Sequence, residues 1–345
     1  MRRQLLFVIC ASLMGAVALA QNPGDQPTAG YTNFRSYLNS DAGNFKAPLA
    51  AAQTLALPEG FAAENMSVFE QYVLLGQGGE PGRYVLINRQ TGLVRWNVEI
   101  GVSPVPLDFG PAFNNDLVLL GGSTTASVSA VQVSTGATLW GDDRVGPSDG
   151  RSPILTNDLS LFAGQYGVVA ARPSDGLVFW QNPSSEDIGS VELAKAPLST
   201  YGSRVYGLAA NGNLFALNLL TGAAQWSAPE IGSDGSNVIA TRKYVFVNNP
   251  ANGTVSAVRT SNGSVAWSVE LDGTFGNPGI ALAYNQLFVF WATQTELKIS
   301  ALNPQTGTLL WEVSDAALPL HIPEAPAANP PWFAQVANNA VYFYN

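Results

Sequence analysis

The sequence predicts an all-β protein that forms a seven-bladed β-propeller of four-stranded antiparallel blades, and three observations support this fold class. An eleven-residue phrase occurs six times, and the copies end at Trp96, Trp140, Trp180, Trp226, Trp267 and Trp311. Successive tryptophans are 44, 40, 46, 41 and 44 residues apart, and a period of about 40–45 residues is typical of one four-stranded blade per repeat. Short apolar runs separated by Asn, Asp and Gly fill each repeat, as expected for strands joined by tight turns.

The phrase itself predicts two strands and the turn between them. Its first copy is LINRQTGLVRW at 86–96, and its last is ALNPQTGTLLW at 301–311. The glycine suits the turn because it takes positive φ without a Cβ clash. We expect the tryptophan ring to pack against the neighbouring blade. A small residue in the first position would leave room for close packing, at Ala130, Ala170, Ala216, Ala257 and Ala301.

Two further strands precede each new phrase. Pro111-Ala112-Phe113 leads through a turn to the apolar run at 117–120. The same order recurs within 153–164, 197–208, 238–247 and 279–290. Each repeat therefore contains the four strands of one blade.

The ends of the chain bear on the number of blades. After Trp311 the sequence runs to Asn345, where a seventh phrase would begin, and a degraded copy, YLNSDAGNFKA, stands at Tyr37–Ala47. We expect this N-terminal strand to close the last blade, since pairing both ends of the chain removes an open sheet edge. Seven blades are the simplest account, and six or eight remain alternatives.

The first twenty residues predict export. Arg2 and Arg3 precede an apolar run from Leu5 to Leu19, and a small-x-small triplet ends at Ala20. This pattern is typical of a secretory signal peptide at 1–20; a membrane anchor is the alternative, for which the run is short. Residues 21–30 read as a flexible leader and 31–345 as one propeller domain. The expected location is periplasmic or secreted.

Composition excludes several kinds of chemistry. Cys10, within the signal, is the only cysteine, and His321 is the only histidine, so disulfides, thiol catalysis and clusters of Cys or His metal ligands are excluded from the mature chain. Removal of 1–20 takes two arginines and lowers the formal net charge from −9 to −11. That charge disfavours nucleic acid and anionic lipid as partners. We expect a monomer without stable membrane insertion after signal cleavage.

The six phrases resemble the tryptophan-docking motif of PQQ-like repeat β-propellers, and the resemblance covers about residues 31–345. That family includes quinoprotein dehydrogenases, which hold pyrroloquinoline quinone and Ca²⁺ in the central funnel. It also includes non-catalytic propellers of the bacterial outer-membrane assembly machinery. Fold alone does not separate them. Lean blades, apolar inner strands and the absence of adjacent cysteines place this chain closer to the non-catalytic type.

Few side chains are candidates for a site. The polar residues near the predicted inner strands are Glu64, Asn65, Arg151, Lys195, Asn237, Asn277 and Gln335. Arg151 and Lys195 could bind an anion at one mouth of the channel, although surface solvation is the favoured reading. The acidic pairs Asp142-Asp143 and Glu186-Asp187 could bind Ca²⁺ weakly, with solvated loop charge as the default.

Three aromatic residues stand apart from the phrase. His321 lies in a Pro-rich stretch that suggests a stiff connector, with an exposed partner loop as the alternative. Trp291 and Trp332 lie outside the repeated position and are read as core residues, with ligand binding as the alternative. No catalytic, cofactor-binding or metal-binding residue is assigned.

These observations favour an exported non-enzymatic scaffold for other envelope or secreted proteins, without a cofactor. Two alternatives remain: a minimal quinoprotein dehydrogenase that uses PQQ and Ca²⁺, and a propeller that binds a small ligand or carbohydrate.

Overall fold

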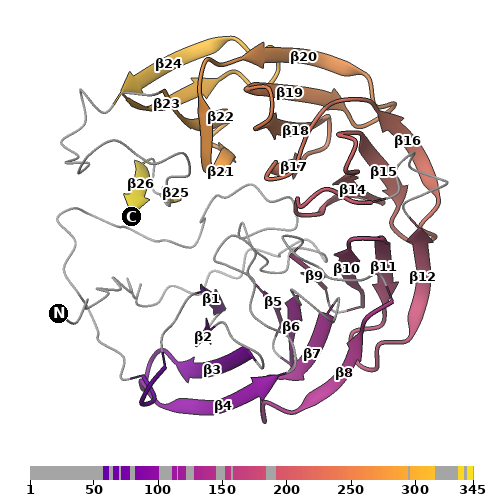
Figure 1. Ribbon diagram of the computed structural model, residues 1–345, viewed down its shortest axis with the longest axis vertical. Helices are drawn as coiled ribbons and strands as arrows, with labels where there is room; N and C mark the ends of the chain where they lie inside the picture. The colour runs from indigo at the N-terminus through magenta and orange to yellow at the C-terminus, as the bar shows by residue number, and fades with distance from the viewer. Residues whose placement is uncertain are drawn as a thin grey trace.

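A computed structural model of the chain describes residues 57–61, 65–69, 71–77, 82–100, 111–114, 116–121, 128–144, 152–156, 158–183, 192–293, 296–314, 333–337 and 340–344. Antiparallel four-stranded sheets stand side by side around a common centre, an arrangement of the β-propeller type (Figure 1). The prediction of an all-β fold made of such sheets is confirmed. None of the described residues forms a helix long and apolar enough to cross a membrane. The predicted signal peptide at 1–20, the leader at 21–30 and the degraded phrase at Tyr37–Ala47 lie outside the described residues.

Each of the first three sheets contains four consecutive strands. The first has β1 (Asn65–Phe69), β2 (Tyr72–Gln77), β3 (Gly82–Asn88) and β4 (Val94–Ile100). The second has β5 (Ala112–Phe113), β6 (Leu117–Gly121), β7 (Val128–Gln132) and β8 (Thr138–Asp142). The third has β9 (Ile154–Leu155), β10 (Ser160–Gly164), β11 (Gly167–Ala171) and β12 (Val178–Pro183).

The next three sheets repeat this order, and the last one is extended. The fourth has β13 (Ser199–Tyr201), β14 (Arg204–Leu208), β15 (Leu214–Asn218) and β16 (Ala224–Ala228). The fifth has β17 (Val238–Ala240), β18 (Tyr244–Asn249), β19 (Thr254–Arg259) and β20 (Val265–Glu270). The sixth has β21 (Thr274–Ala283), β22 (Gln286–Ala292), β23 (Leu297–Leu302) and β24 (Leu309–Ser314). A hairpin of β25 (Phe333–Ala337) and β26 (Ala340–Tyr344) joins it through a parallel bridge between Asn277 and Phe333.

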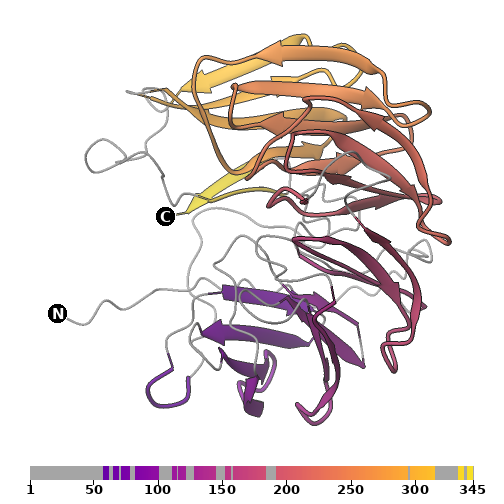
Figure 2. The same ribbon diagram turned by 45° about the vertical axis from the view of Figure 1, so that its right-hand side comes forward.

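Strand order within a sheet runs from the centre of the molecule outward. Figure 1 shows β1, β5 and β17 near the centre and β4, β8, β12, β16, β20 and β24 on the outer rim. Figure 2 shows the sheets next to one another around the molecule, from indigo at the first to yellow at the last. The apolar core lies between them, because each main cluster of buried side chains draws on two neighbouring sheets.

The repeated phrase forms the same local structure in every sheet. Its glycine adopts positive φ, as in Gly136 (φ 77°) and Gly222 (φ 70°), and donates its N–H to the carbonyl four residues earlier. A β-bulge follows the first residue of the phrase in all six sheets. That first residue lies opposite the tryptophan of its own sheet, as Ala216 does opposite Trp226. The five alanines in this position are fully buried.

The tryptophans also connect each sheet to the next. Five indole Nε1–H groups donate to a backbone carbonyl of the following sheet at 2.7–3.2 Å, in the pairs Trp96–Val133, Trp140–Pro173, Trp180–Leu219, Trp226–Thr260 and Trp267–Pro304. The phrase glycine of that following sheet lies against the same ring. A Cβ atom on it would come within 2.4–2.9 Å of the tryptophan, at Gly136, Gly176, Gly222, Gly263 and Gly307. Trp311 differs, since its Nε1–H donates to Gln286 Oε1 within its own sheet at 3.1 Å.

Candidate functional site

The antiparallel order gives the molecule two unlike faces. Turns that join first to second and third to fourth strands lie at one end of the sheets, which we call the turn face. Turns that join second to third strands, and the connections between sheets, lie at the other end, the loop face. Turns between third and fourth strands are five or six residues long in every sheet. Connections between sheets range from three residues before β21 to fifteen before β13. Variation in segment length therefore concentrates on the loop face.

Charged side chains are distributed unequally between the faces. Among the described residues, the turns and strand ends of the turn face carry Arg89, Arg95, Arg172, Arg204, Arg242, Lys243 and Arg259, with the carboxylates Asp116, Asp158 and Asp175. Within the same described residues, the loop face carries four basic residues, Arg83, Arg144, Lys195 and Lys298. Its described carboxylates are Glu59, Glu99, Asp142, Asp143, Glu192, Glu230, Asp234, Glu270, Asp272 and Glu296, with Glu312 paired to Lys298. One face is thus net positive and the other net negative.

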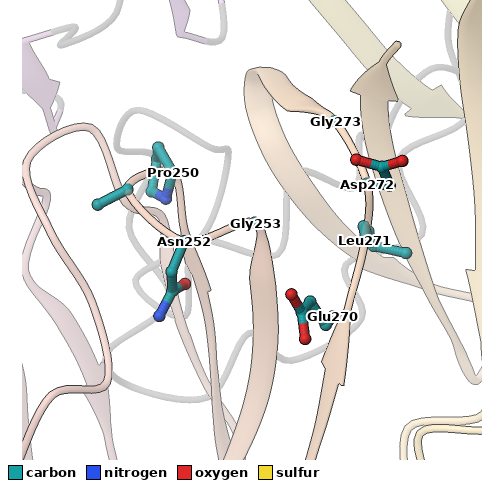
Figure 3. A pocket seen from close by; sticks show the side chains of 8 residues that line it. Pro250, Asn252, Gly253, Glu270, Leu271, Asp272 and Gly273 are labelled. Carbon is teal, nitrogen blue, oxygen red and sulfur yellow. The ribbon is translucent and has the colours of Figure 1, made fainter.

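The loop face contains a shallow groove, shown in Figure 3. It lies between the turn Pro250–Gly253 and the segment Glu270–Gly273. The Leu271 N–H donates to the Gly253 carbonyl at 2.8 Å, which holds the two walls together. Gly253 has φ 71°, and a Cβ atom on it would meet the Leu271 carbonyl at 2.5 Å. With Glu270 and Asp272 exposed along it, the groove could receive a basic side chain more readily than an anion.

Two of the predicted polar candidates have defined places, and they serve the framework. Asn237 is buried just before β17. Its Oδ1 accepts from the Gly279 N–H of the next sheet at 2.6 Å, and its own N–H donates to Asn248 Oδ1 at 2.7 Å. Lys195 is exposed on the loop face, where its N–H donates to Asp234 Oδ1 at 2.8 Å and its carbonyl accepts from Gly235 at 3.0 Å.

The other polar candidates are placed only in part. Asn65 lies on β1 and Asn277 on β21, the first strands of the first and sixth sheets. Gln335 lies on β25, which is paired to β21. Arg151 and Glu64 lie outside the described residues, as do Glu186-Asp187, His321 and Trp332. Surface solvation of Arg151 stays a prediction, and so does its alternative, an anion site that Arg151 and Lys195 form at one mouth of the channel.

Asp142 and Trp291 are bonded within the structure. Asp142 is 8% exposed and forms an ion pair with Arg144 at 2.7 Å, whereas Asp143 is exposed. Trp291 is buried, and its Nε1–H donates to Ser300 Oγ at 2.9 Å. The Ser300 hydroxyl donates to Glu312, which also pairs with Lys298 at 3.1 Å. Among the described side chains, no group of three or more His, Cys, Asp or Glu residues is arranged to hold a metal ion.

Sequence reasoning missed a polar link near the centre of the molecule. Asn248, on β18, is fully buried and receives the Asn237 N–H. Ser199 Oγ accepts the Ala240 N–H at 3.0 Å and joins the fourth sheet to the fifth. Nothing in the local pattern distinguishes Asn248 from the turn-forming asparagines that the sequence contains in numbers. Two buried tyrosines have shifted titration: burial raises the pKa of Tyr84, and burial also raises the pKa of Tyr206, although the nearby Arg204 guanidinium lowers it.

The family profile and the curated relatives that match this sequence share one description. A family profile described as "Outer membrane protein assembly factor BamB" matches residues 50–269. The protein of that name from Moranella endobia (strain PCIT) is 26% identical over 199 residues, which are 54% of this chain and 49% of that protein. The one from Yersinia pestis is 27% identical over 202 residues, 55% of this chain and 49% of that protein. The chain thus spans about half the length of these curated relatives.

Structural comparison shows the fold. The crystal structure of BamB from Moraxella catarrhalis superposes with a TM-score of 0.61 at 16% identity, covering 81% of this chain and 80% of that chain. Quinohemoprotein alcohol dehydrogenase from Comamonas testosteroni gives 0.65 at 12% identity, covering 94% and 71%. Enzymes and assembly factors share this fold, so the structural likeness does not decide between them. The family profile does assign the sequence, and this chain belongs to the family of the outer membrane protein assembly factor BamB.

Proposed function

We propose that this protein is an exported, non-enzymatic β-propeller that serves as an interaction or assembly scaffold for other proteins of the cell envelope. The observation that carries the proposal is the contrast between a uniform framework and a variable loop face. Third-to-fourth-strand turns have nearly one length, whereas the connections between sheets vary from three to fifteen residues. Binding residues are found disproportionately on loops that a rigid scaffold positions.

The inner strands support a scaffold rather than an enzyme. Among the described residues, β5, β9 and β17 contribute Ala, Phe, Ile, Leu and Val, all buried. β13 contributes Ser199, Thr200 and the half-buried Tyr201, and Ser199 Oγ is bonded to the Ala240 N–H. Asn237, the best-placed polar candidate, uses its carboxamide oxygen and its N–H within the framework. A catalytic site needs titratable groups with access to substrate, and a PQQ and Ca²⁺ site needs several converging oxygen ligands. We therefore propose that the protein works without a cofactor.

We further propose seven blades and closure of the ring by the chain's own N-terminal part. The hairpin β25–β26 lies beyond six complete sheets and is too short to form a blade alone. The degraded phrase at Tyr37–Ala47 has glycine in the phrase position, at Gly43. A blade shared between the two ends of the chain would remove an open edge and favour a monomer. Limited proteolysis tests this arrangement: closure predicts that cleavage after Lys46 leaves the two fragments associated, and their separation on a sizing column would contradict it.

Photo-crosslinking tests the scaffold proposal. A photoreactive amino acid replaces exposed loop-face residues, Glu230 or Asp272, in the protein expressed in its own cell envelope. We expect a discrete protein adduct from these positions after irradiation. Asp143, exposed on the same face but on another sheet, shows whether the contact is local. Absence of any protein adduct from the loop face, with the protein stably produced and exported, would contradict the proposal.

The dehydrogenase alternative has its own decisive measurement. Purified protein is incubated with PQQ and Ca²⁺, and quinone absorbance and dye reduction with alcohols or sugars are recorded. We expect neither a red-shifted quinone band nor dye reduction above that of free PQQ. Substrate-dependent dye reduction would replace the scaffold proposal with an enzyme.

A further inference from the structure

The turn face, unlike the protein as a whole, is positively charged. Its described residues include seven arginines and lysines and three carboxylates, in a chain whose formal net charge is −9. Arg242 and Lys243, in the turn before β18, are both exposed, as is Arg259 at the end of β19. Net charge therefore conceals a separation of charge between the two faces.

The positive charges of this face are held mainly by neutral groups. Arg95 donates to Tyr72 Oη at 2.8 Å and to the Val133 carbonyl at 3.1 Å. Lys243 Nζ donates to Gln305 Oε1 at 2.9 Å. Within the described part of this face, the ion pair is Arg172 with Asp175, at 3.5 Å between exposed side chains. Hydrogen bonds to neutral acceptors orient a cation but leave its charge uncompensated.

Exposed apolar side chains share the turn face and its rim. Leu220 is 78% exposed, Leu93 is 69% exposed and Leu177 is 53% exposed, all in turns before outer strands. Phe179 and Leu309 follow at the start of β12 and β24. Of the large exposed apolar residues that the structure describes, Tyr166 is the one on the loop face. They lie in the turns before the outer strands or at the starts of those strands, in four of the six sheets, and so form an interrupted ring at one level of the molecule.

We propose that the turn face rests on an anionic membrane surface, with its arginines and lysines at the lipid phosphates and its leucines among the headgroups. Basic residues combined with exposed apolar side chains are characteristic of surfaces that bind the membrane interface. A planar partner contacts a ring of separate side chains all at once. A protein partner instead binds one contiguous patch, which covers only a small part of a protein's surface. Side chains distributed around a whole face therefore suit a planar membrane better than a protein partner.

The acidic face does not prevent this contact. Outer strands of five to seven residues separate the two faces, which corresponds to about 17–23 Å at roughly 3.3 Å per residue. The Debye length at physiological ionic strength is about 8 Å. Carboxylates of the loop face are therefore screened from lipid beneath the turn face. This orientation goes beyond the scaffold function, and it leaves the loop face directed into the aqueous space where protein partners would bind.

Vesicle sedimentation tests the proposal. The chain without residues 1–20 is mixed with vesicles of phosphatidylethanolamine and phosphatidylglycerol, or with vesicles of phosphatidylcholine, at low and high salt. We expect binding to the anionic vesicles that weakens with salt, and little binding to phosphatidylcholine. Arg242→Glu changes the charge by two units on the turn face, and at roughly fivefold per unit it should weaken binding about 25-fold. Lys195→Glu makes the same change on the loop face and should alter binding less than about twofold, since it lies beyond a Debye length.

A second pair of variants separates apolar contact from charge. Leu220→Ser on the turn face should weaken binding several-fold, whereas Tyr166→Ser on the loop face should not, because only the former would reach the headgroups. All four side chains are exposed, so thermal unfolding should be nearly unchanged and loss of binding cannot come from misfolding.

Three results would overturn the proposal. One is no sedimentation of folded protein with anionic vesicles at low salt. Another is equal loss of binding in Arg242→Glu and Lys195→Glu, which would assign the effect to net charge. The third is a protein adduct from a photoreactive residue at Leu220 together with no vesicle binding, which would make the turn face a protein interface. None of these affects adducts from the loop face, so the scaffold proposal is tested separately.

Discussion

The contact between Gly222 and Trp180 allows a quantitative test of how neighbouring sheets are joined. Trp180 is 8% exposed, and its Nε1–H is held by the Leu219 carbonyl at 2.9 Å. A Cβ atom on Gly222 would lie 2.4 Å from Cε3 and 2.6 Å from Cδ2 of that ring. Gly222→Ala should therefore force the third and fourth sheets apart or rotate the indole away from its hydrogen bond.

The expected loss has two components. Alanine at φ +70° costs about 1–2 kcal/mol in backbone conformation. Overpacking against a well-packed ring adds about 1–3 kcal/mol, and the lower entropy of the unfolded alanine chain returns about 0.4–1 kcal/mol. The net loss of unfolding free energy should be about 2–4 kcal/mol.

Gly202→Ala is the matched control. Gly202 has φ +59°, and nothing lies within 4 Å of the position that its Cβ would take. The unfolding free energy of this variant should fall only by the cost of alanine at positive φ, less the gain from the lower entropy of the unfolded chain, a net loss of about 1 kcal/mol. The difference between the two variants measures the contact with Trp180.

The assay is urea unfolding followed by tryptophan fluorescence. The dependence of unfolding free energy on urea concentration must be equal in the variants, so that differences in the midpoint urea concentration report differences in stability. Losses that agree within about 0.5 kcal/mol, the usual limit of additivity, would refute the reasoning. Trp180→Ala combined with Gly222→Ala adds a check, because removal of the ring should abolish the clash and make the two effects strongly non-additive.

Other variants test separate features. Trp180→Ala should cost about 3–5 kcal/mol. Trp311 is 37% exposed and bonds within its own sheet, but the proposed closure would place the phrase glycine Gly43 against its ring. Trp311→Ala should then cost a similar amount, and a clearly smaller loss in urea unfolding would contradict the closure. Asn237→Ala leaves the buried Gly279 N–H without its acceptor and should cost about 1–3 kcal/mol, whereas Asn211→Ala, in an exposed turn, should cost less than half of that in the same assay. Burial raises the pKa of Tyr84 above its ordinary 10.0, so its neutral form stabilises the fold fully below pH 10 and this stability is lost as pH rises from there toward the folded pKa. Tyr84→Phe should flatten that decline in unfolding midpoints measured across alkaline pH, and an unchanged slope would count against the burial of the hydroxyl.

The repeated phrase was sufficient to predict the sheet architecture. Its glycine position, its turn and its strand pairing depend on residues close together in sequence, and Gly136 and Gly222 have the positive φ that the turn requires. The spacing of the phrase and the residues of its turn both indicate the same four-stranded sheet, and a sequence pattern is reliable when its local and global features agree in this way. The family follows from the same residues, and it is confirmed by the match over 50–269.

Individual polar residues were less predictable. Asn237 was a candidate for the channel, and the structure uses it to join the fifth sheet to the sixth. Asp142 was assigned to solvated loop charge and is instead buried at the end of β8, where it pairs with the exposed Arg144. Both outcomes depend on which neighbours fold against a residue, and those neighbours are not adjacent in sequence.

By itself, the sequence determined the repeating four-stranded unit and the family, since turn chemistry and hydrophobic period act over a few residues. It also fixed the total charge, which favoured no anionic partner. Only the tertiary structure decided where that charge lies. Stacking the sheets side by side brings Arg172, Arg242 and Arg259 to one face and Glu230 and Asp272 to the other, although they alternate along the chain. Screening over a few ångströms makes the two faces electrostatically separate, so the surface that a partner meets differs from the average that composition reports.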